Sequence, residues 1–208
     1  HEFHAVLLGR GLDAGLDLGR DALAQLLDEV GIAFLFAQQL HPAMAAVVPV
    51  RKALGVRTVF NLLGPLTNPA APPYQLIGAY SKDAARLMAE TLAGMPLERA
   101  FVVHGEPGWD EATPVGPFLR LTVERGTITR DTCDPRFHGV PRCAAASLAG
   151  GDAAHNAARL RAALTGEPGA HRDALALGAL LRVLVGECGS VNAHDAALFE
   201  FGLDVEFG

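Results

Sequence analysis

The stretch YQLIGAYSKDAARLMAETLAGMPLERAFVVHG, residues 74–105, decides the fold class. Its first seven residues, YQLIGAY, have the composition of a strand, and Lys82 to Gly94 has the apolar spacing of an amphipathic helix. RAFVVHG, residues 99–105, is a nearly continuous apolar run, which is typical of a parallel strand covered on both faces. This alternation of strand, helix and strand predicts an α/β fold with a mainly parallel sheet flanked by helices.

Further elements are expected on the C-terminal side of this stretch. From Phe118 to Asp131, apolar and polar residues alternate around Arg125-Gly126, which predicts a β-hairpin. Two Ala/Leu-rich helices are expected at Ala153 to Leu164 and at Asp173 to Val185. No internal repeat or interdomain linker interrupts the chain, so residues 1–208 are expected to form a single α/β domain.

The N-terminal side predicts two helices and a strand. A helix is expected at Asp21 to Val30, a buried strand within IAFLFA at residues 32–37, and a helix at Pro42 to Leu54 that Pro49 would kink. The segment NLLGPLTNPAAPP, residues 61–73, is rich in Pro, Gly and Asn, so we expect an ordered loop without regular structure there. Loops of this kind often line binding sites.

Composition restricts the class of partner. The chain has 23 acidic and 17 basic side chains and a formal charge of −6, so it has no overall positive field to attract nucleic acid or a membrane surface. Its three cysteines, Cys133, Cys143 and Cys188, show no CxxC spacing, and no apolar run approaches the roughly 20 residues of a membrane span. We therefore expect a reduced cytoplasmic protein whose partners are neither nucleic acids nor membranes.

An acidic pair, Asp110-Glu111, follows directly on the apolar strand in VVHGEPGWDE, residues 102–111. Ligands bind at the C-terminal ends of strands in open α/β sheets, and Gly105 and Gly108 would let the backbone approach a ligand closely. Two adjacent carboxylates in such a place can hold Mg²⁺ together with substrate phosphate oxygens. A solvated acidic turn is the alternative that the spacing leaves open.

Three further residues can be interpreted either as ligand contacts or as structural residues. Arg51 could grip a carboxylate with its planar guanidinium, or could lie on the surface of an amphipathic helix. His41 could contact a ligand, or could only begin the helix at Pro42. His104 could border the site after the strand, or could be a partly buried structural histidine.

The turn Gly150-Gly151-Asp152 could cradle a phosphate group. It precedes a predicted helix, however, and Asp152 is well placed as the N-cap of that helix, so capping is the preferred interpretation. The sequence contains no GxxxxGK[ST], GxGxxG, HExxH or GxSxG motif. Nucleotide hydrolysis, dinucleotide redox chemistry, zinc proteolysis and serine hydrolysis therefore lack their usual support.

Three blocks of the sequence resemble the anthranilate phosphoribosyltransferases. Residues 31–70, GIAFLFAQQLHPAMAAVVPVRKALGVRTVFNLLGPLTNPA, resemble the signature region of that family. VVHGEPGWDEATPVGP resembles its second conserved block, and GGDAAHNA resembles a third and weaker one. The resemblance implies an α/β catalytic domain like that of nucleoside phosphorylases and phosphoribosyltransferases.

The resemblance also implies roles for individual residues. Asp110 and Glu111 look like the acidic pair that binds Mg²⁺ on phosphoribosyl pyrophosphate (PRPP). Arg51 looks like the arginine that grips the anthranilate carboxylate, and His41 lies at the position of a histidine lining the anthranilate channel. Residues 64–67, Gly-Pro-Leu-Thr, resemble a segment that shapes the same site.

The implied reaction is attack of the anthranilate amine on the anomeric carbon of the ribose, with release of pyrophosphate, in tryptophan biosynthesis. An arylamine is already neutral near pH 7, so no side chain is assigned as a catalytic base. Catalysis would rest on positioning and on Mg²⁺ neutralising charge on the departing pyrophosphate.

The sequence departs from the family pattern at both ends. The family's phosphate-cradling Gly-Thr-Gly-Gly-Asp loop, its Asn-x-Ser-Thr segment and its Lys-His-Gly-Asn-Arg segment do not occur in the first fifteen residues, and Gly178 stands where the family usually has Asn. We therefore expect a partial catalytic domain, inactive alone, without the N-terminal helical domain through which family members form homodimers. The alternatives are a non-catalytic remnant that binds aromatic acids and a related pyrimidine nucleoside phosphorylase.

Overall fold

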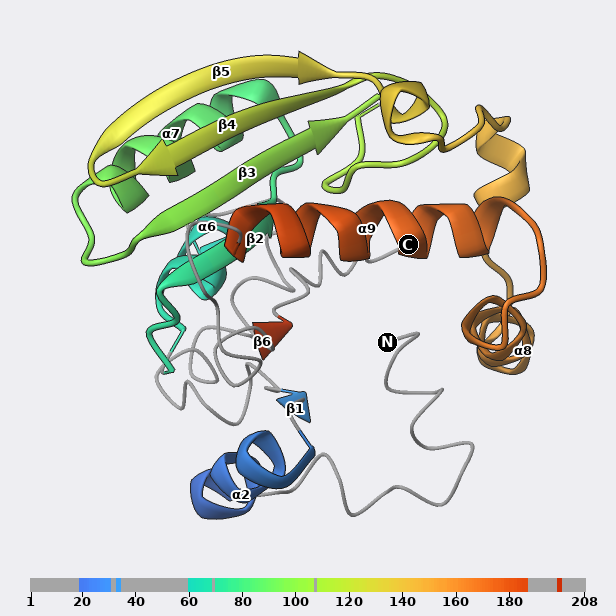
Figure 1. Cartoon of the computed structure of the whole chain (residues 1–208), viewed down its shortest axis with the longest axis horizontal. Helices are drawn as coiled ribbons and strands as arrows, with labels where there is room; N and C mark the ends of the chain where they lie inside the picture. Colours follow the sequence, from blue (N-terminus) through green and yellow to red (C-terminus); the bar gives the residue numbers. More distant parts are fainter. Residues whose placement is uncertain are drawn as a thin grey trace, which may run out of the picture.

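A four-stranded sheet forms the centre of the part of the chain that the structure describes (Figure 1). The structure is a computed structural model, and it describes residues 19–30, 33–34, 60–68, 70–106, 108–186 and 198–199. The strands lie in the order β2-β3-β4-β5, with the bounds Tyr74–Gly78, Arg99–Gly105, Phe118–Glu124 and Thr127–Cys133. β2 and β3 pair in parallel, whereas the other two pairings are antiparallel. The α/β class is confirmed, and the sheet is mixed rather than mainly parallel because a hairpin supplies β4 and β5.

Each face of this sheet is covered by one helix. α7, Lys82–Ala93, packs against β3 and β4 on one face, and α9, Ala170–Gly186, packs across β2 and β3 on the other (Figure 1). Side chains along β3 alternate between the two layers, so Val102 belongs to the core under α7 and Phe101 to the core under α9. Burial on both faces explains why RAFVVHG is continuously apolar, as predicted.

α7 begins and ends where its sequence predicts. The Ala84 N–H donates to the Ser81 hydroxyl at 3.1 Å, and Gly94 caps the C-terminus. The apolar stripe of the helix, which includes Met88 and Leu92, is buried against the sheet. The expected amphipathic helix is therefore confirmed.

The predicted hairpin is formed by β4 and β5. Arg125 and Gly126 connect the two strands, and their φ angles of 47° and 82° are those of a type I′ turn, whose twist matches that of paired strands. β4 alternates between buried and half-buried residues, whereas nearly all of β5 is exposed because it is the outer strand of the sheet.

The N-terminal side of the chain contributes one helix and one short strand to the described residues. α2, Arg20–Val30, confirms the helix expected from Asp21. β1, Ala33–Phe34, lies inside the expected strand and pairs in parallel with β6, Leu198–Phe199. The helix expected at Pro42 to Leu54 lies outside the described residues.

The expectation of an irregular loop across residues 61–73 is wrong for its first half. Phe60–Leu66 forms a helix, α6, with Pro65 in its last turn. Pro65 lacks a backbone donor, but the helix ends directly afterwards, where the Thr67 hydroxyl donates to the Leu63 carbonyl at 2.8 Å. Two leucines of α6 pack against the core under α7, so tertiary packing outweighs the poor helix propensity of Gly and Pro.

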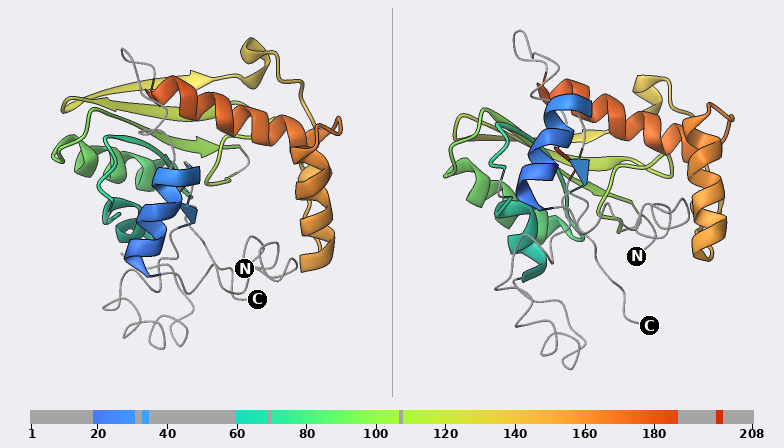
Figure 2. Two further views of the ribbon diagram at one scale, coloured as in Figure 1. Left: turned by 60° about the horizontal axis from the view of Figure 1, so that its bottom comes forward. Right: turned by 90° about the horizontal axis from the view of Figure 1, so that it is seen from below.

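The C-terminal helices follow the hairpin. Two short 3₁₀ helices, η2 (Pro135–His138) and η3 (Ala145–Leu148), lead from β5 to α8, Ala153–Leu164. α8 has the bounds predicted for it, α9 contains the other predicted helix, and the two helices meet at a steep angle (Figure 2). No helix among the described residues is long and apolar enough to cross a membrane.

Candidate functional site

The acidic pair lies at the C-terminal ends of the two parallel strands. β2 ends at Gly78 and β3 at Gly105, and the strands are paired along this edge of the sheet. Residues 106–117, which we call the acidic loop, join β3 to β4 and contain Asp110 and Glu111. Ligands of open α/β sheets bind at this position, so the location expected for the pair is the one observed.

Two glycines bring the backbone of the acidic pair directly against the strand ends. A Cβ atom at Gly78 would overlap the backbone carbonyl of Asp110, and a Cβ atom at Gly105 would overlap that of Glu111. Only glycine fits at either position without displacing the loop. Sequence analysis singled out Gly105 for approach to a ligand and did not indicate Gly78, because a contact between a loop and the ends of two different strands leaves no local pattern.

A tight turn follows β3 and fixes the start of the acidic loop. The Gly108 and Trp109 N–H groups both donate to the Gly105 carbonyl, at 2.9 and 3.1 Å, and the Gly105 N–H donates to the Trp109 carbonyl at 2.8 Å. Gly108 has a φ of 132°, which an L side chain rarely adopts. Gly108 therefore serves the turn, and the close backbone contacts of the loop are those at Gly105 and Gly78. The close approach to a ligand expected at Gly105 and Gly108 stays a prediction.

The electrostatics of the pair suit a divalent cation. Glu111 is exposed to solvent, yet the surrounding protein partly desolvates its carboxyl group, which raises its pKa; the neighbouring charge of Asp110 raises that pKa further. A cation held by both carboxylates would relieve this repulsion.

The donor set fits Mg²⁺ only if other oxygens complete the coordination. Among the described residues, no group of three or more His, Cys, Asp or Glu side chains is placed to hold a metal ion. Mg²⁺ commonly binds through one or two carboxylates, with water and substrate phosphate oxygens filling the remaining positions. The pair Asp110 and Glu111 would supply the protein's share of such a site.

His104 has a structural role at the same edge. Its Nδ1 lies 2.7 Å from the Ala79 carbonyl, which can only accept, so this nitrogen donates. The Ala79 N–H in turn donates to the Val103 carbonyl at 2.8 Å. These two bonds tie the end of β2 to the end of β3, which supports the structural interpretation of His104.

The Gly150-Gly151-Asp152 turn caps a helix, as preferred from the sequence. The Asp152 carboxylate accepts from the His155 N–H at 2.8 Å, at the start of α8. The Asn156 side chain bonds both the N–H and the carbonyl of Gly151, at 2.8 and 2.9 Å. The turn is thus held by its own helix, and sequence reasoning had not identified Asn156 as its partner.

The other predicted site residues divide into two groups. Arg51 and His41 lie outside the described residues. Residues 64–67 are described, and they form the end of α6 and the turn after it. Of the side chains predicted to bind a ligand, the structure therefore describes Asp110 and Glu111, which are adjacent in the chain.

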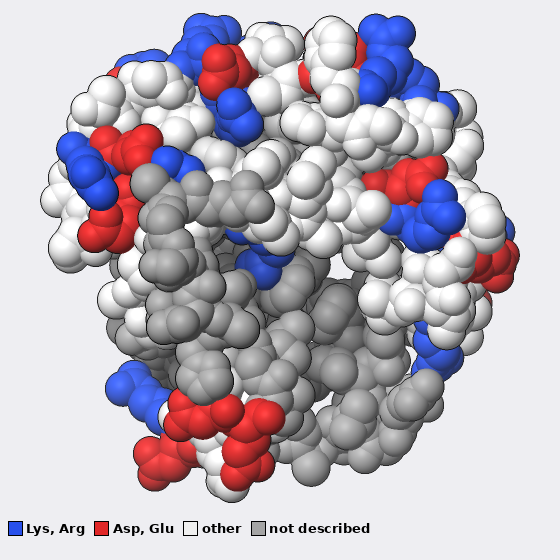
Figure 3. All heavy atoms as spheres, in the orientation of Figure 1, with Lys and Arg blue, Asp and Glu red and all other residues white. Residues whose placement is uncertain are grey.

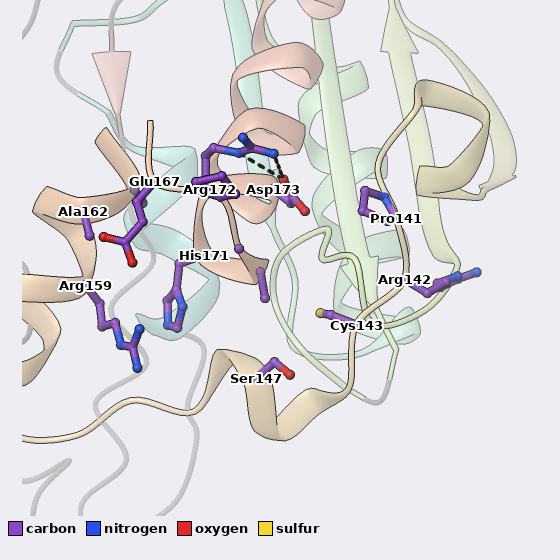
Figure 4. A pocket seen from close by; sticks show the side chains of 14 residues that line it. Pro141, Arg142, Cys143, Ser147, Arg159, Ala162, Glu167, His171, Arg172 and Asp173 are labelled. Atoms are coloured by element: carbon purple, nitrogen blue, oxygen red, sulfur yellow. Dashed lines mark hydrogen bonds and ion pairs between the residues drawn. The ribbon is translucent and has the colours of Figure 1, made fainter. Parts of the chain in front are cut away.

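A separate pocket of about 450 Å³ lies between α8, the start of α9 and residues 141–147 (Figure 4). Arg159 and His171 line it, and Arg172 and Asp173 pair with each other at its wall at 2.8 Å. Burial raises the pKa of the Cys143 thiol in the same wall, and Asp173 raises it further, so this thiol is a poor nucleophile. None of the residues predicted for the site lines this pocket.

Residues 7–199 match the family described as glycosyl transferase family, a/b domain. The chain belongs to this family. It is 43% identical over 189 residues to the anthranilate phosphoribosyltransferase of Moorella thermoacetica, which covers 91% of this chain and 56% of that protein. It is 47% identical over 169 residues to that of Rubrobacter xylanophilus, covering 81% of this chain and 49% of the relative. The chain thus spans about half the length of the curated relatives it matches.

Solved structures of anthranilate phosphoribosyltransferases have the same fold. The enzyme of Thermus thermophilus aligns with a TM-score of 0.76 and 37% identity, covering 93% of this chain and 56% of that one. The enzyme of Saccharomyces cerevisiae in complex with PRPP and Mg aligns with a TM-score of 0.77 and 25% identity, covering 88% of this chain and 52% of that one. The resemblance inferred from the three sequence blocks is confirmed.

Proposed function

We propose that the chain is the part of an anthranilate phosphoribosyltransferase that holds Mg²⁺ and anthranilate. The reaction transfers phosphoribose from PRPP to the anthranilate amine, releases pyrophosphate and serves tryptophan biosynthesis. The observation that carries the proposal is the placement of Asp110 and Glu111 against Gly78 and Gly105, at the ends of two parallel strands. The relatives of known name support it, since they are anthranilate phosphoribosyltransferases.

In this proposal each assigned residue binds or positions a substrate. Asp110 and Glu111 would hold Mg²⁺, which when bound neutralises charge on the departing pyrophosphate. Arg51 would grip the anthranilate carboxylate through its planar guanidinium, and His41 would line the anthranilate channel. No residue is assigned as a base, because the amine of anthranilate is already neutral and needs only to be oriented.

The charge of the chain is consistent with a role for the cation. The chain has a formal charge of −6, and on the face in Figure 3 basic and acidic side chains are mixed, with acidic residues gathered on α2. A polyanion such as PRPP is not attracted by such a surface. A cation on the acidic pair supplies the local positive charge that PRPP binding requires.

The proposal extends to the organisation of the intact protein. We infer one α/β catalytic unit over residues 1–208 and a homodimer of the intact protein in the cytoplasm, with anthranilate and PRPP as its small-molecule partners. Neither nucleic acid nor a membrane surface has a part in the proposed reaction.

A hybrid enzyme tests the proposed function. In this hybrid, the chain replaces the matching half of the Moorella thermoacetica relative, and turnover is followed as the loss of anthranilate fluorescence. We expect turnover that requires both PRPP and Mg²⁺. Binding of anthranilate without turnover would instead indicate a non-catalytic remnant, and phosphorolysis of thymidine or uridine would indicate a nucleoside phosphorylase.

Arg51 is tested in the same hybrid. A lysine cannot reproduce a bidentate contact with a carboxylate, so we expect Arg51→Lys to raise the KM for anthranilate by about ten-fold or more, in line with the roughly 1.5–3 kcal/mol of a charge-assisted contact. The KM for PRPP should change little. An unchanged KM for anthranilate in both Arg51→Lys and Arg51→Ala would remove Arg51 from the site.

A further inference from the structure

The basic side chain of Arg142 lies next to the acidic loop. Residues 140–143 follow η2 and its cap Gly139, and one hydrogen bond joins them to the returning arm of the loop, residues 113–117. The Cys143 N–H donates to the Pro114 carbonyl at 3.2 Å, which joins the two segments. Arg142 is the charged residue of this segment.

Arg142 is anchored at one end to the sheet. Its guanidinium lies 3.0 Å from Oδ2 of Asp134, the residue that directly follows β5. Asp134 is fixed in turn, because its Oδ1 accepts from the Arg136 N–H at 3.0 Å and its Oδ2 accepts from the Arg136 guanidinium at 2.8 Å. Asp134 therefore keeps a cationic partner and its capping bond even without Arg142.

The second terminal nitrogen of the Arg142 guanidinium, Nη1, lies near Gly116 of the acidic loop. A Cβ atom at Gly116 would lie 3.6 Å from one terminal guanidinium nitrogen of Arg142 and 2.9 Å from Cβ of Glu106. That nitrogen is buried and has no hydrogen-bond partner among the described residues. Gly116 thus lies between Arg142 and the outgoing arm of the loop. The two arms of the loop are joined there, because the Glu106 N–H donates to the Pro117 carbonyl at 3.4 Å.

We propose that Arg142 is a positioning residue for the acidic loop: it links Asp134, at the end of β5, to Gly116 and so holds the loop that presents Asp110 and Glu111. The inference rests on the proposed function where it takes the loop to bind Mg²⁺, but the contacts of Arg142 with Asp134 and Gly116 do not depend on that function. A buried donor without a partner costs free energy, so its placement against Gly116 is kept by packing and by the Asp134 contact rather than by a bond of its own. Groups that orient metal ligands in this indirect way affect metal affinity without touching the metal.

The single tryptophan of the chain, Trp109, immediately precedes Asp110, so its fluorescence reports on the acidic loop alone. We compare acrylamide quenching of Trp109 in the 208-residue chain without metal, for the wild type, Arg142→Ala, Arg142→Lys and the control Arg136→Ala. The control removes the other cationic partner of the same carboxylate, whereas the guanidinium near Gly116 is that of Arg142. Far-ultraviolet circular dichroism of each variant verifies that it is folded.

We expect quenching to rise by about two-fold in Arg142→Ala, as a local opening of the loop predicts, and to stay unchanged in Arg136→Ala. Arg142→Lys should lie between the two, since it keeps the charge near Asp134 but loses the planar group against Gly116. Equal quenching in Arg142→Ala and Arg136→Ala would overturn the proposal. If Arg142→Ala does not fold, Arg142→Met serves in its place, because it keeps most of the side-chain volume but removes the guanidinium. Wild-type quenching in that variant would overturn the proposal as well.

A second measurement separates this inference from the proposed function. The same substitutions are made in the hybrid enzyme, and the Mg²⁺ concentration for half-maximal turnover is measured in the presence of PRPP and anthranilate. We expect the midpoint to rise by about ten-fold in Arg142→Ala, the lower end of the effect of removing a group that orients a metal ligand, and to remain at the wild-type value in Arg136→Ala. If the hybrid without these substitutions shows no turnover that requires Mg²⁺ and PRPP, the proposed function fails, while quenching of the 208-residue chain without metal still decides the role of Arg142.

Discussion

At the scale of single residues, the candidate site depends on the absence of two side chains as much as on the presence of two carboxylates. Gly78 and Gly105 let the carbonyl groups of Asp110 and Glu111 lie against the strand ends. The acidic pair was predictable from the sequence, because it follows an apolar strand directly. The contact with Gly78 was not, because it joins residues far apart in the chain and depends on how β2 and β3 pair.

Gly78→Ala tests this close approach. Its methyl group would overlap the Asp110 carbonyl, so the loop must move, and we expect the free energy of unfolding to fall by about 1–3 kcal/mol, as for other overpacked sites. Denaturant unfolding measures the change, and Trp109 emission should shift at the same time. Gly178→Ala is the matched control, because a methyl group there meets open space within α9, so stability should rise by roughly 0.5–1 kcal/mol. A Gly78→Ala protein as stable as the wild type would show that the loop has room to spare.

At the scale of elements, local signals predicted most of the helices and strands. The caps of α7, the hairpin turn and the bounds of α8 all follow from short-range preferences of particular residues, such as Ser81, Gly126 and Asp152. α6 was missed because its sequence, FNLLGPL, has poor helix propensity and is stabilised by packing against the core under α7. The antiparallel pairing of β4 with β3 could not be predicted either, because the local sequence of a strand does not determine which strand it pairs with or in which direction.

The hairpin turn carries a residue that is poorly suited to its conformation. Arg125 has a φ of 47°, a region in which asparagine and glycine are far more favourable than arginine. We expect Arg125→Asn to raise the free energy of unfolding by about 0.5 kcal/mol, because the exposed ion pair that it removes, with Glu98 at 3.5 Å, contributes little to stability. Urea unfolding at neutral pH checks this. A decrease in stability would mean that the ion pair outweighs the turn preference.

At the scale of the whole molecule, charged contacts join elements that are separate in the chain. One such group surrounds Asp134, which joins the end of β5 to η2 and to Arg142. Hydrogen bonds from the Arg136 side chain and backbone, followed by the charges of Arg136 and Arg142, hold the pKa of Asp134 well below its ordinary value of 3.8.

This lowered pKa predicts the pH dependence of stability. A carboxyl group with a lowered pKa in the folded state stabilises the protein fully above its ordinary pKa, and that contribution is lost as the pH falls below 3.8 towards the folded value. We therefore expect Asp134→Asn to be less stable than the wild type at neutral pH, and the difference to shrink below about pH 4. Urea unfolding at both pH values measures it. A difference that stays constant with pH would mean that the Asp134 charge does not contribute.

The Mg²⁺ dependence of turnover in the hybrid enzyme tests the role of the acidic pair most directly. Asp110→Asn combined with Glu111→Gln should raise the Mg²⁺ concentration for half-maximal turnover by about ten-fold or more, because contacts with charged groups are worth roughly 1.5–3 kcal/mol. Glu106→Gln, which removes another carboxylate from the same loop, is the matched control and should leave the Mg²⁺ dependence unchanged. An unaltered Mg²⁺ dependence in the double variant would contradict the assignment and would mean that Asp110 and Glu111 form only a solvated turn.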